Sequence, residues 1–309
     1  MYLSRHNPVI LISNFIRIWL NIHMSISSIF PLLKCSICSS GTLALHGEIS
    51  CPNGHVFQIK EEKVFFTSPP EDIKPTVRAH AKSPSHWTTW RRSNYSFFEK
   101  ILHSLDSSTI LLDLGTGQGQ FSNLIKRFPI LARADFYPYP DANVICDFPE
   151  ALPFKDDSFN LIIASNVLEH VPNTGRLLTE CTRVLKPGGQ LVATIPFLLQ
   201  VHQEPYDFHR YTYIMLHKLL VESGYSDIKI VPLTSPAETY AQIQLHFFQH
   251  KFATKSTFSL KIFWMLQRLL NRLFQPLLAQ GEPHLGMTIG YGISASIRTK
   301  PSITRDPSV

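Results

Sequence analysis

The residues of this chain that most clearly indicate chemistry are an acid followed by three glycines at alternate positions. Asp113 lies at the end of an apolar run, and Gly115, Gly117 and Gly119 follow it. Glycines lack the Cβ atoms that keep a ligand away from the backbone, and the N–H groups at the start of a following helix attract anions. The pattern therefore predicts a strand, a tight turn and a helix that together bind a nucleotide-like molecule. Dinucleotide-binding proteins use a similar loop, so the glycines alone leave the ligand open.

Two more carboxylates follow in an order that narrows the choice. Asp135 ends an apolar segment about 18 residues after Gly117, where a second strand would present a carboxylate to the paired hydroxyls of a ribose. Asp147 comes next, ahead of a buried strand expected over 161–164 and of a Leu-Glu-His triplet that ends at His170. A helix and a Lys-Pro-Gly-Gly turn then lead into another strand. This is the order of a parallel α/β domain.

The ordered set resembles the class I S-adenosylmethionine-dependent methyltransferases, in particular the type 11 group, whose motifs run DxGxGxG, LPF with SFD, LEH and LKPGG. The resemblance covers residues 95–232. It implies an α/β fold with a Rossmann-like sheet of seven strands and S-adenosyl-L-methionine as cofactor. It also implies that Asp113 and the three glycines line the methionine part of the cofactor, that Asp135 holds the ribose, and that Asp147 with the Phe148 backbone reads the adenine edge.

A second cluster, nearer the N-terminus, has the spacing of a metal site. Cys35 and Cys38 are followed after twelve residues by Cys51 and then by His55, so that two turns each offer two donors to a tetrahedral ion such as zinc. A redox pair is the poorer interpretation because no thioredoxin-like pattern surrounds the cysteines. A site in which His55 is not a ligand stays open. The module resembles the zinc-binding part of the bacterial 23S rRNA guanine-N1 methyltransferases, which implies a small structural zinc ribbon.

A third polar group follows the strand that ends near residue 197. It contains His202, Asp207, His209 and Arg210, just past the C-terminal edge of a central strand, where open α/β sheets bind ligands. His202 or His209 could remove a proton from a hydroxyl or an amine, since imidazole titrates near neutral pH. His170 is a further candidate at the cofactor mouth. The alternative is that Asp207 and Arg210 form a structural ion pair and that the histidines only cap the loop.

Length and composition agree with one α/β domain and a small module. The chain has 309 residues, of which 44% are hydrophobic and 17% are charged, so it can bury a full core and is not disordered in composition. The formal charge of +6 permits an acidic partner, such as nucleic acid, anionic lipid or a phosphorylated substrate, without selecting one. Five cysteines do not suggest a disulfide framework, and a zinc-bound cluster favours a reducing compartment, so we expect a cytoplasmic protein.

We expect the following organisation: an N-terminal extension over 1–30, a zinc-ribbon-like module over 31–67, a linker over 68–92, the methyltransferase domain over 93–300 and a tail over 301–309. Met24 could be the true start, in which case the residues before it are not translated. We expect residues 228–233 and 287–298 to form the final antiparallel strand pair of the sheet, with a helical insertion over 234–286 between them.

Within the insertion, residues 258–278 show apolar and basic residues at helical spacing. Such a helix could rest on an anionic membrane surface, which would make the protein membrane-peripheral. It could equally be buried against the domain or a second subunit, or roof the substrate pocket.

The residues therefore favour an S-adenosylmethionine-dependent methyltransferase whose acceptor is a small molecule, a lipid-linked compound or a glycan. The zinc-ribbon-like module makes RNA a candidate partner, and the alternative function is rRNA methylation of the guanine-N1 type. A further alternative is a non-catalytic cofactor-binding scaffold whose zinc ribbon recruits a partner.

Overall fold

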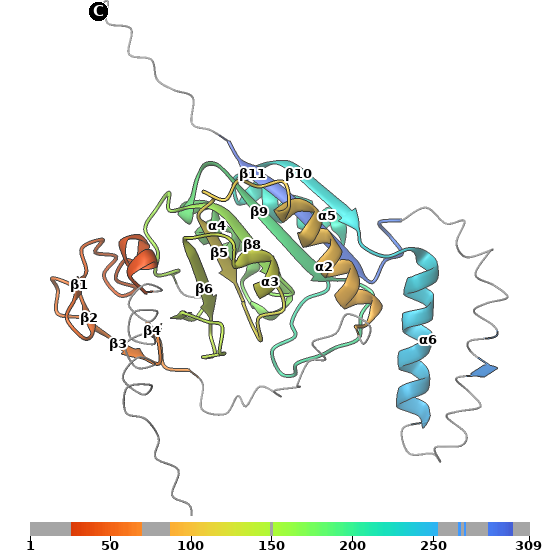
Figure 1. The fold of residues 1–309 in the computed structure, drawn as a ribbon. Helices are drawn as coiled ribbons and strands as arrows, with labels where there is room; N and C mark the ends of the chain where they lie inside the picture. The colour runs from red at the N-terminus through yellow and green to blue at the C-terminus, as the bar shows by residue number, and fades with distance from the viewer. Residues whose placement is uncertain are drawn as a thin grey trace, which may run out of the picture.

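The fold is a twisted sheet with helices on both faces (Figure 1). The computed structural model describes residues 26–69, 87–148, 151–252, 265–266, 269 and 284–298. Most of the expected amphipathic helix over 258–278 thus lies outside the described residues. The strands are β1 (Ala44–Leu45), β2 (Ile49–Ser50), β3 (Val56–Lys60), β4 (Lys63–Phe65), β5 (Leu111–Leu114), β6 (Leu131–Asp135), β7 (Val144–Ile145), β8 (Phe159–Ser165), β9 (Leu185–Pro196), β10 (Tyr225–Pro232) and β11 (Gly290–Ile297).

The sheet is wider than the resemblance implied. It has 11 strands in the order β1-β2-β3-β4-β7-β6-β5-β8-β9-β11-β10, so the expectation of seven is wrong. The reason is that β4 of the N-terminal module pairs in parallel with β7 and extends the sheet at that edge. The Val64 N–H donates to the Asn143 carbonyl at 3.0 Å, and the Phe66 N–H donates to Ile145 at 2.8 Å. The edge that an isolated α/β domain would expose is therefore covered.

The central strands form the parallel part of the sheet. β5 pairs in parallel with β6 and β8, and β8 pairs in parallel with β9. All four residues of β5 are buried, as expected for a strand covered on both faces. At the far edge, β10 and β11 are antiparallel, which confirms the expected final strand pair on either side of the insertion.

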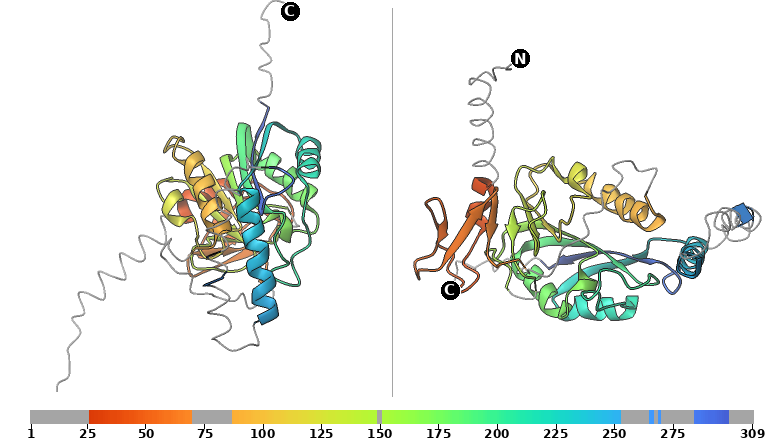
Figure 2. Two further views of the ribbon diagram at one scale, coloured as in Figure 1. Left: turned by 90° about the vertical axis from the view of Figure 1, so that its right-hand side faces the viewer. Right: turned by 90° about the horizontal axis from the view of Figure 1, so that it is seen from below.

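Helices cover both faces of the sheet (Figure 2). The helical segments are η1 (Phe30–Leu32), α2 (Thr89–Leu102), α3 (Ser122–Ile125), η3 (Leu168–His170), α4 (Thr174–Val184), α5 (Tyr213–Glu222) and α6 (Pro236–Phe252). α2 and α3 lie on one face, and α4 and α5 lie on the other. α2 begins inside the range assigned to a linker, because the side chain of Thr88 accepts a hydrogen bond from the Arg91 N–H and caps the helix. No helix among the described residues is long and apolar enough to span a bilayer.

Two glycines of β11 let α2 lie close to the sheet. A Cβ at Gly290 would lie 2.3 Å from a ring carbon of Trp90, and a Cβ at Gly292 would lie 2.6 Å from a ring carbon of Phe97. Both distances are below van der Waals contact, so only glycine fits at these positions. The close contact fixes α2 across β11.

The N-terminal module shares its core with the α/β domain. Leu33 and Phe154 form an antiparallel bridge, and the Lys34 N–H donates to the Pro153 carbonyl at 3.0 Å. Buried apolar residues of both parts form one continuous cluster that includes Ile29, Leu33, Ile49, Phe57, Val64, Leu112, Val144 and Phe154. The module is therefore packed as part of the domain rather than tethered beside it.

Candidate functional site

The glycine loop follows β5 in a backbone conformation that requires glycine. Gly115, Gly117 and Gly119 have φ values of +74°, +51° and +73°. A Cβ at Gly115 would lie 2.4 Å from Val167 Cγ2, just after β8, so the two strand ends approach closely. The expected helix is the single turn α3, which begins at Ser122. The loop thus presents bare backbone at the C-terminal edge of the sheet.

Two buried acids flank the loop. Asp135 Oδ2 accepts a hydrogen bond from the Gly117 N–H at 2.8 Å, and its Oδ1 accepts one from the Tyr137 N–H at 3.1 Å. Asp113 Oδ2 accepts a hydrogen bond from the Thr116 hydroxyl at 2.7 Å. Burial raises the pKa of Asp113 to about 6 and that of Asp135 to about 7. Both side chains can therefore change protonation state when a polar ligand arrives.

The third expected acid lies at the end of the next strand. The Cys146 N–H donates to the Asp135 carbonyl at 3.0 Å and holds the end of β7 beside β6. Asp147 follows and is exposed, whereas the Phe148 ring is buried. The C-terminal ends of β5, β6 and β7 thus carry Asp113, Asp135 and Asp147 in turn. Parallel pairing, rather than sequence proximity, brings these acids to one edge.

Two of the three candidate histidines meet at a buried glutamate. His170 Nε2 lies 3.6 Å from Glu169 Oε1, and His202 Nε2 lies 3.9 Å from the same atom. The two imidazole rings contact each other edge to face, with centroids 5.0 Å apart. Glu169 and His170 belong to η3 at the end of β8, and His202 comes from the loop after β9. We call these three residues the Glu-His-His cluster.

An ion pair holds the loop that carries His202. Arg210 Nη1 lies 2.6 Å from Asp207 Oδ1, and Arg210 Nη2 lies 2.7 Å from Asp207 Oδ2. Burial alone would raise the pKa of Asp207, but hydrogen bonds from Arg210 and from the His202 N–H lower it to about 2. The same guanidinium donates to the carbonyls of Leu199 and Gln200. The structure therefore contains the ion pair that the sequence left open, and this pair positions His202.

The orientation of both cluster histidines follows from the partners of their Nδ1 atoms. His170 Nδ1 lies 2.6 Å from the Tyr206 carbonyl, which can only accept. His202 Nδ1 lies 3.1 Å from Asp207 Oδ2 and 3.3 Å from Arg210 Nη2. We assign the hydrogen bond to Asp207, because Arg210 Nη2 already donates to Gln200 and to Asp207. Each Nδ1 therefore carries a proton, and each Nε2 of the neutral rings is left with a lone pair.

Glu169 was not among the expected site residues, although the Leu-Glu-His triplet contains it. Its side chain is 0% exposed, and neither carboxyl oxygen has a hydrogen-bond partner among the described residues. Burial raises its pKa to about 8, partly opposed by its own backbone N–H and by the charge of Arg210. Burial also lowers the pKa values of His170 and His202. A sequence pattern shows that an acid follows a strand, but not that its carboxyl group is buried without a partner.

His209 lies apart from the cluster. Its ring stacks on Tyr211 with centroids 4.8 Å apart, and its Nε2 lies 3.2 Å from the Pro172 carbonyl. Its backbone N–H donates to the Glu169 carbonyl at 3.2 Å. These contacts fit the interpretation in which this histidine caps its loop.

The four expected metal ligands of the N-terminal module meet in one place. Cys35 Sγ lies 3.5 Å from His55 Nδ1, Cys51 Sγ lies 3.4 Å from the same nitrogen, and Cys38 Sγ lies 3.7 Å from Cys51 Sγ. Around a tetrahedral zinc ion with ordinary bond lengths, ligand atoms are about 3.8 Å apart for two sulfurs and about 3.6 Å apart for sulfur and nitrogen. The backbone N–H of Ser40 lowers the pKa of the Cys38 thiol to about 6, which favours the thiolate. The donor set and its spacing fit zinc.

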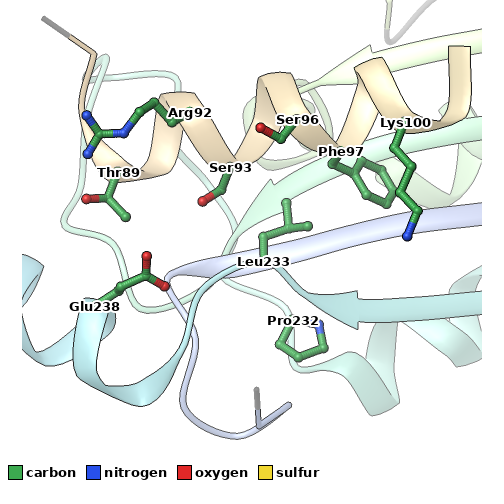
Figure 3. Close-up of a pocket in the computed structure, with 9 residues that line it drawn as sticks. All are labelled: Thr89, Arg92, Ser93, Ser96, Phe97, Lys100, Pro232, Leu233 and Glu238. Carbon is green, nitrogen blue, oxygen red and sulfur yellow. The ribbon is translucent and has the colours of Figure 1, made fainter. Parts of the chain in front are cut away.

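A separate hollow lies between α2 and the end of β10 (Figure 3). Its volume is about 370 Å³. Its lining is formed by Thr89, Arg92, Ser93, Ser96, Phe97, Lys100, Pro232, Leu233 and Glu238. Residues of α2 line one side, and β10 and the start of α6 line the other. It shares no residue with the glycine loop or with the Glu-His-His cluster.

Part of the chain is similar to known methyltransferases. Residues 112–193 match the family model described as a methyltransferase domain. An uncharacterised methyltransferase of Mycobacterium tuberculosis is 57% identical over 42 residues, which cover 14% of this chain and 16% of that protein. An uncharacterised protein of Methanocaldococcus jannaschii is 38% identical over 90 residues, or 29% of this chain and 32% of that protein. The chain thus spans less than a third of the length of these relatives.

Solved structures with a similar arrangement include phosphoethanolamine N-methyltransferase 2 of Haemonchus contortus in complex with phosphomonomethylethanolamine and S-adenosylhomocysteine. The sequence identity is 15%, the superposition covers 68% of this chain and 53% of that chain, and the TM-score is 0.42. The family match over 112–193 includes the glycine loop, Asp135, Asp147 and Glu169.

Proposed function

We propose that this protein transfers a methyl group from S-adenosyl-L-methionine to a small-molecule, lipid-linked or glycan acceptor. The observation that carries the proposal is the coupling of the glycine loop to Asp135, whose carboxylate accepts the Gly117 N–H at 2.8 Å in the region that matches the methyltransferase domain. A buried carboxylate can accept hydrogen bonds from the two hydroxyls of a ribose. The glycine backbone beside it lets the methionine part of the cofactor lie close to the loop.

The residues fit the cofactor. Asp113 and the three glycines would line its methionine part, Asp135 would hold the ribose, and Asp147 with the Phe148 backbone would read the adenine. The sulfonium of the cofactor supplies the leaving group, so the protein needs mainly to align donor and acceptor and to exclude water.

The acceptor side is proposed to be the Glu-His-His cluster. Val167, which contacts the glycine loop, lies two positions before Glu169, so the cluster lies near the glycine loop in space and at the same edge of the sheet. The Nε2 lone pairs of His170 and His202 can take a proton from an acceptor hydroxyl or amine as the methyl group is transferred. His209 remains a weaker candidate because its ring faces the Pro172 carbonyl.

The test is calorimetric titration with S-adenosylhomocysteine, run beside a transfer assay with radiolabelled methyl donor. The products are separated into RNA, organic-extractable and water-soluble glycan fractions. Binding with label in the organic or glycan fraction supports the proposal. Label in RNA supports the alternative, and failure to bind S-adenosylhomocysteine contradicts the cofactor assignment itself.

The alternative function, guanine-N1 type methylation of rRNA, is favoured by one observation. The Cys35, Cys38, Cys51 and His55 side chains converge with distances that fit a zinc ribbon, as the resemblance to the rRNA enzymes implied. We propose that this zinc is structural, because four protein ligands leave no open position for chemistry. A scaffold without catalytic activity is the further alternative, and binding of S-adenosylhomocysteine without transfer to any fraction would support it.

A further inference from the structure

We propose that the Glu-His-His cluster is a second metal site, which binds a divalent first-row transition ion through Glu169, His170 Nε2 and His202 Nε2. The ligand atoms of the three residues all lie within 4.8 Å of one another. The three residues come from two segments, η3 and the loop after β9, which meet near the glycine loop. Two imidazoles and one carboxylate are a ligand set that such ions accept with positions left open.

The first argument is that the facing atoms of the cluster converge without forming hydrogen bonds to one another or to other described residues. Both oxygens of Glu169 and the Nε2 of His170 are buried, and none of the three has a hydrogen-bond partner among the described residues. A buried polar atom without a partner has lost its hydrogen bonds to water without replacement, which is unfavourable. In the neutral rings of His170 and His202 each Nε2 carries a lone pair, because the proton of each ring lies on Nδ1. A cation bound between Glu169 and the two Nε2 atoms would give these buried atoms the partner that they lack.

The second argument is that both histidines are already oriented as metal ligands are. A histidine that binds a metal usually donates its other N–H to a carbonyl or a carboxylate, which fixes the ring. His170 donates to the Tyr206 carbonyl at 2.6 Å, and His202 donates to Asp207 Oδ2 at 3.1 Å. Arg210 in turn holds Asp207 through two hydrogen bonds. The Tyr206 carbonyl and the Asp207 carboxylate thus already hold the two imidazole rings in the orientation that a metal ligand needs.

The third argument concerns spacing. Ligand atoms around a tetrahedral ion with Zn–N and Zn–O bonds of ordinary length are about 3.4 Å apart. The distances from Glu169 Oε1 to His170 Nε2 and to His202 Nε2 are 3.6 and 3.9 Å, slightly wider than a closed site. His202 lies in a loop and its side chain is 26% exposed, so the small movement that closes the site does not disturb the core.

The site would define the acceptor class, and this part of the inference rests on the proposed function. An ion with three protein ligands has room for acceptor oxygens, so we infer a hydroxyl acceptor with a neighbouring oxygen, as in a vicinal diol. The acceptor O–H bond breaks and its proton leaves to solvent when the oxygen binds the ion. That oxygen then forms the bond to the methyl carbon, while the carbon–sulfur bond breaks and its electron pair stays on sulfur. Metal binding replaces the role of the histidines as bases, because it uses the same lone pairs.

The test measures metal binding directly. Protein that carries one zinc ion per chain, enough for the Cys35, Cys38, Cys51 and His55 site alone, is titrated with Mn²⁺, and free Mn²⁺ is followed by electron paramagnetic resonance. We expect a single Mn²⁺ per chain in the wild type and an affinity at least about tenfold lower in Glu169→Gln and in His202→Ala. His209→Ala is the matched control from the same loop, and its Mn²⁺ affinity should equal that of the wild type. Far-UV circular dichroism and titration with S-adenosylhomocysteine show whether each variant is folded.

Two results would overturn the proposal: wild-type protein that leaves the Mn²⁺ signal unchanged, or folded Glu169→Gln and His202→Ala variants that bind Mn²⁺ as tightly as wild type. The outcome is separate from that of the proposed function. Protein that binds S-adenosylhomocysteine but no Mn²⁺ keeps the function and loses the site. Protein that binds Mn²⁺ through Glu169 but not S-adenosylhomocysteine keeps the site and loses the function.

Discussion

At the scale of single residues, Asp135 links the glycine loop to the proposed ribose site, and its protonation should control cofactor affinity. Burial raises its pKa to about 7, and only the ionised carboxylate can accept hydrogen bonds from both ribose hydroxyls. The affinity for S-adenosylhomocysteine should therefore fall as the pH is lowered from about 8 to about 6, because a proton competes with the ligand.

Replacing the carboxylate tests this assignment. Asp135→Asn should weaken binding of S-adenosylhomocysteine by about 1.5–3 kcal/mol, or roughly 10- to 150-fold, and should flatten its pH dependence near neutrality. Calorimetric titration at several pH values checks both effects. A variant that keeps the wild-type pH profile would show that another group, such as Asp113, is responsible.

Gly115 tests the close approach of the glycine loop to the end of β8. Gly115→Ala places a Cβ 2.4 Å from Val167 and forces a non-glycine residue to φ +74°. The two effects together should lower the free energy of unfolding by about 2–5 kcal/mol. Gly47 is the matched control, with φ +81° and nothing within 4 Å of a Cβ, so Gly47→Ala should show the backbone cost alone. Equal losses in chemical denaturation would mean that the contact with Val167 is unimportant.

What the sequence reveals at this scale depends on topology. Asp113 and Asp135 were identifiable because each acid ends an apolar run, and parallel strands bring such ends to one edge. Glu169 was not identified as a site residue. Whether a carboxyl group after a strand faces solvent or a buried cluster depends on a loop that arrives from more than thirty residues further along the chain, and periodicity carries no information about that contact.

At the scale of elements, the pairing of β4 with β7 joins the N-terminal module to the α/β domain. Val64→Pro removes the N–H that donates to the Asn143 carbonyl at 3.0 Å. The unpaired carbonyl alone should cost about 1–3 kcal/mol of stability. Val64→Ala shortens the same side chain but keeps the N–H, so it separates pairing from packing. If both variants lose the same stability in chemical denaturation, the hydrogen bond between the strands is not what joins the two parts.

The missed strand shows where sequence patterns fail at this scale. β4 has only three residues, begins with Lys63 and follows a tight turn in which Glu61 and Glu62 have positive φ values, so its two apolar residues are too few to show a strand pattern. By contrast, β10 and β11 could be predicted as a pair across a long insertion, because each is a full strand with apolar residues. Whether a strand pairing could be predicted from the sequence depended on the length of the strands more than on their separation along the chain.

At the scale of the whole molecule, one shared core predicts one cooperative unfolding transition. Removal of the zinc that we propose for Cys35, Cys38, Cys51 and His55 should lower the temperature of that transition rather than abolish a small separate one. S-adenosylhomocysteine at about 100 times its dissociation constant should stabilise the same transition by about 2.7 kcal/mol. Scanning calorimetry with and without a chelator distinguishes the cases. Two transitions, with only one of them responding to the chelator, would show that the two parts unfold independently.

The parallel pairing of β4 with β7 also affects how the protein is made. During translation the N-terminal module leaves the ribosome first, and its partner strand follows about 80 residues later, which is a delay of roughly 4–16 s. Throughout that interval the edge of β4 that faces β7 is unpaired, and the apolar residues of the module lack the part of the core that the α/β domain supplies. On the proposed zinc assignment, metal bound by the nascent chain would bring the ends of the module together early, and β4 would gain its partner and the shared core only when β7 follows.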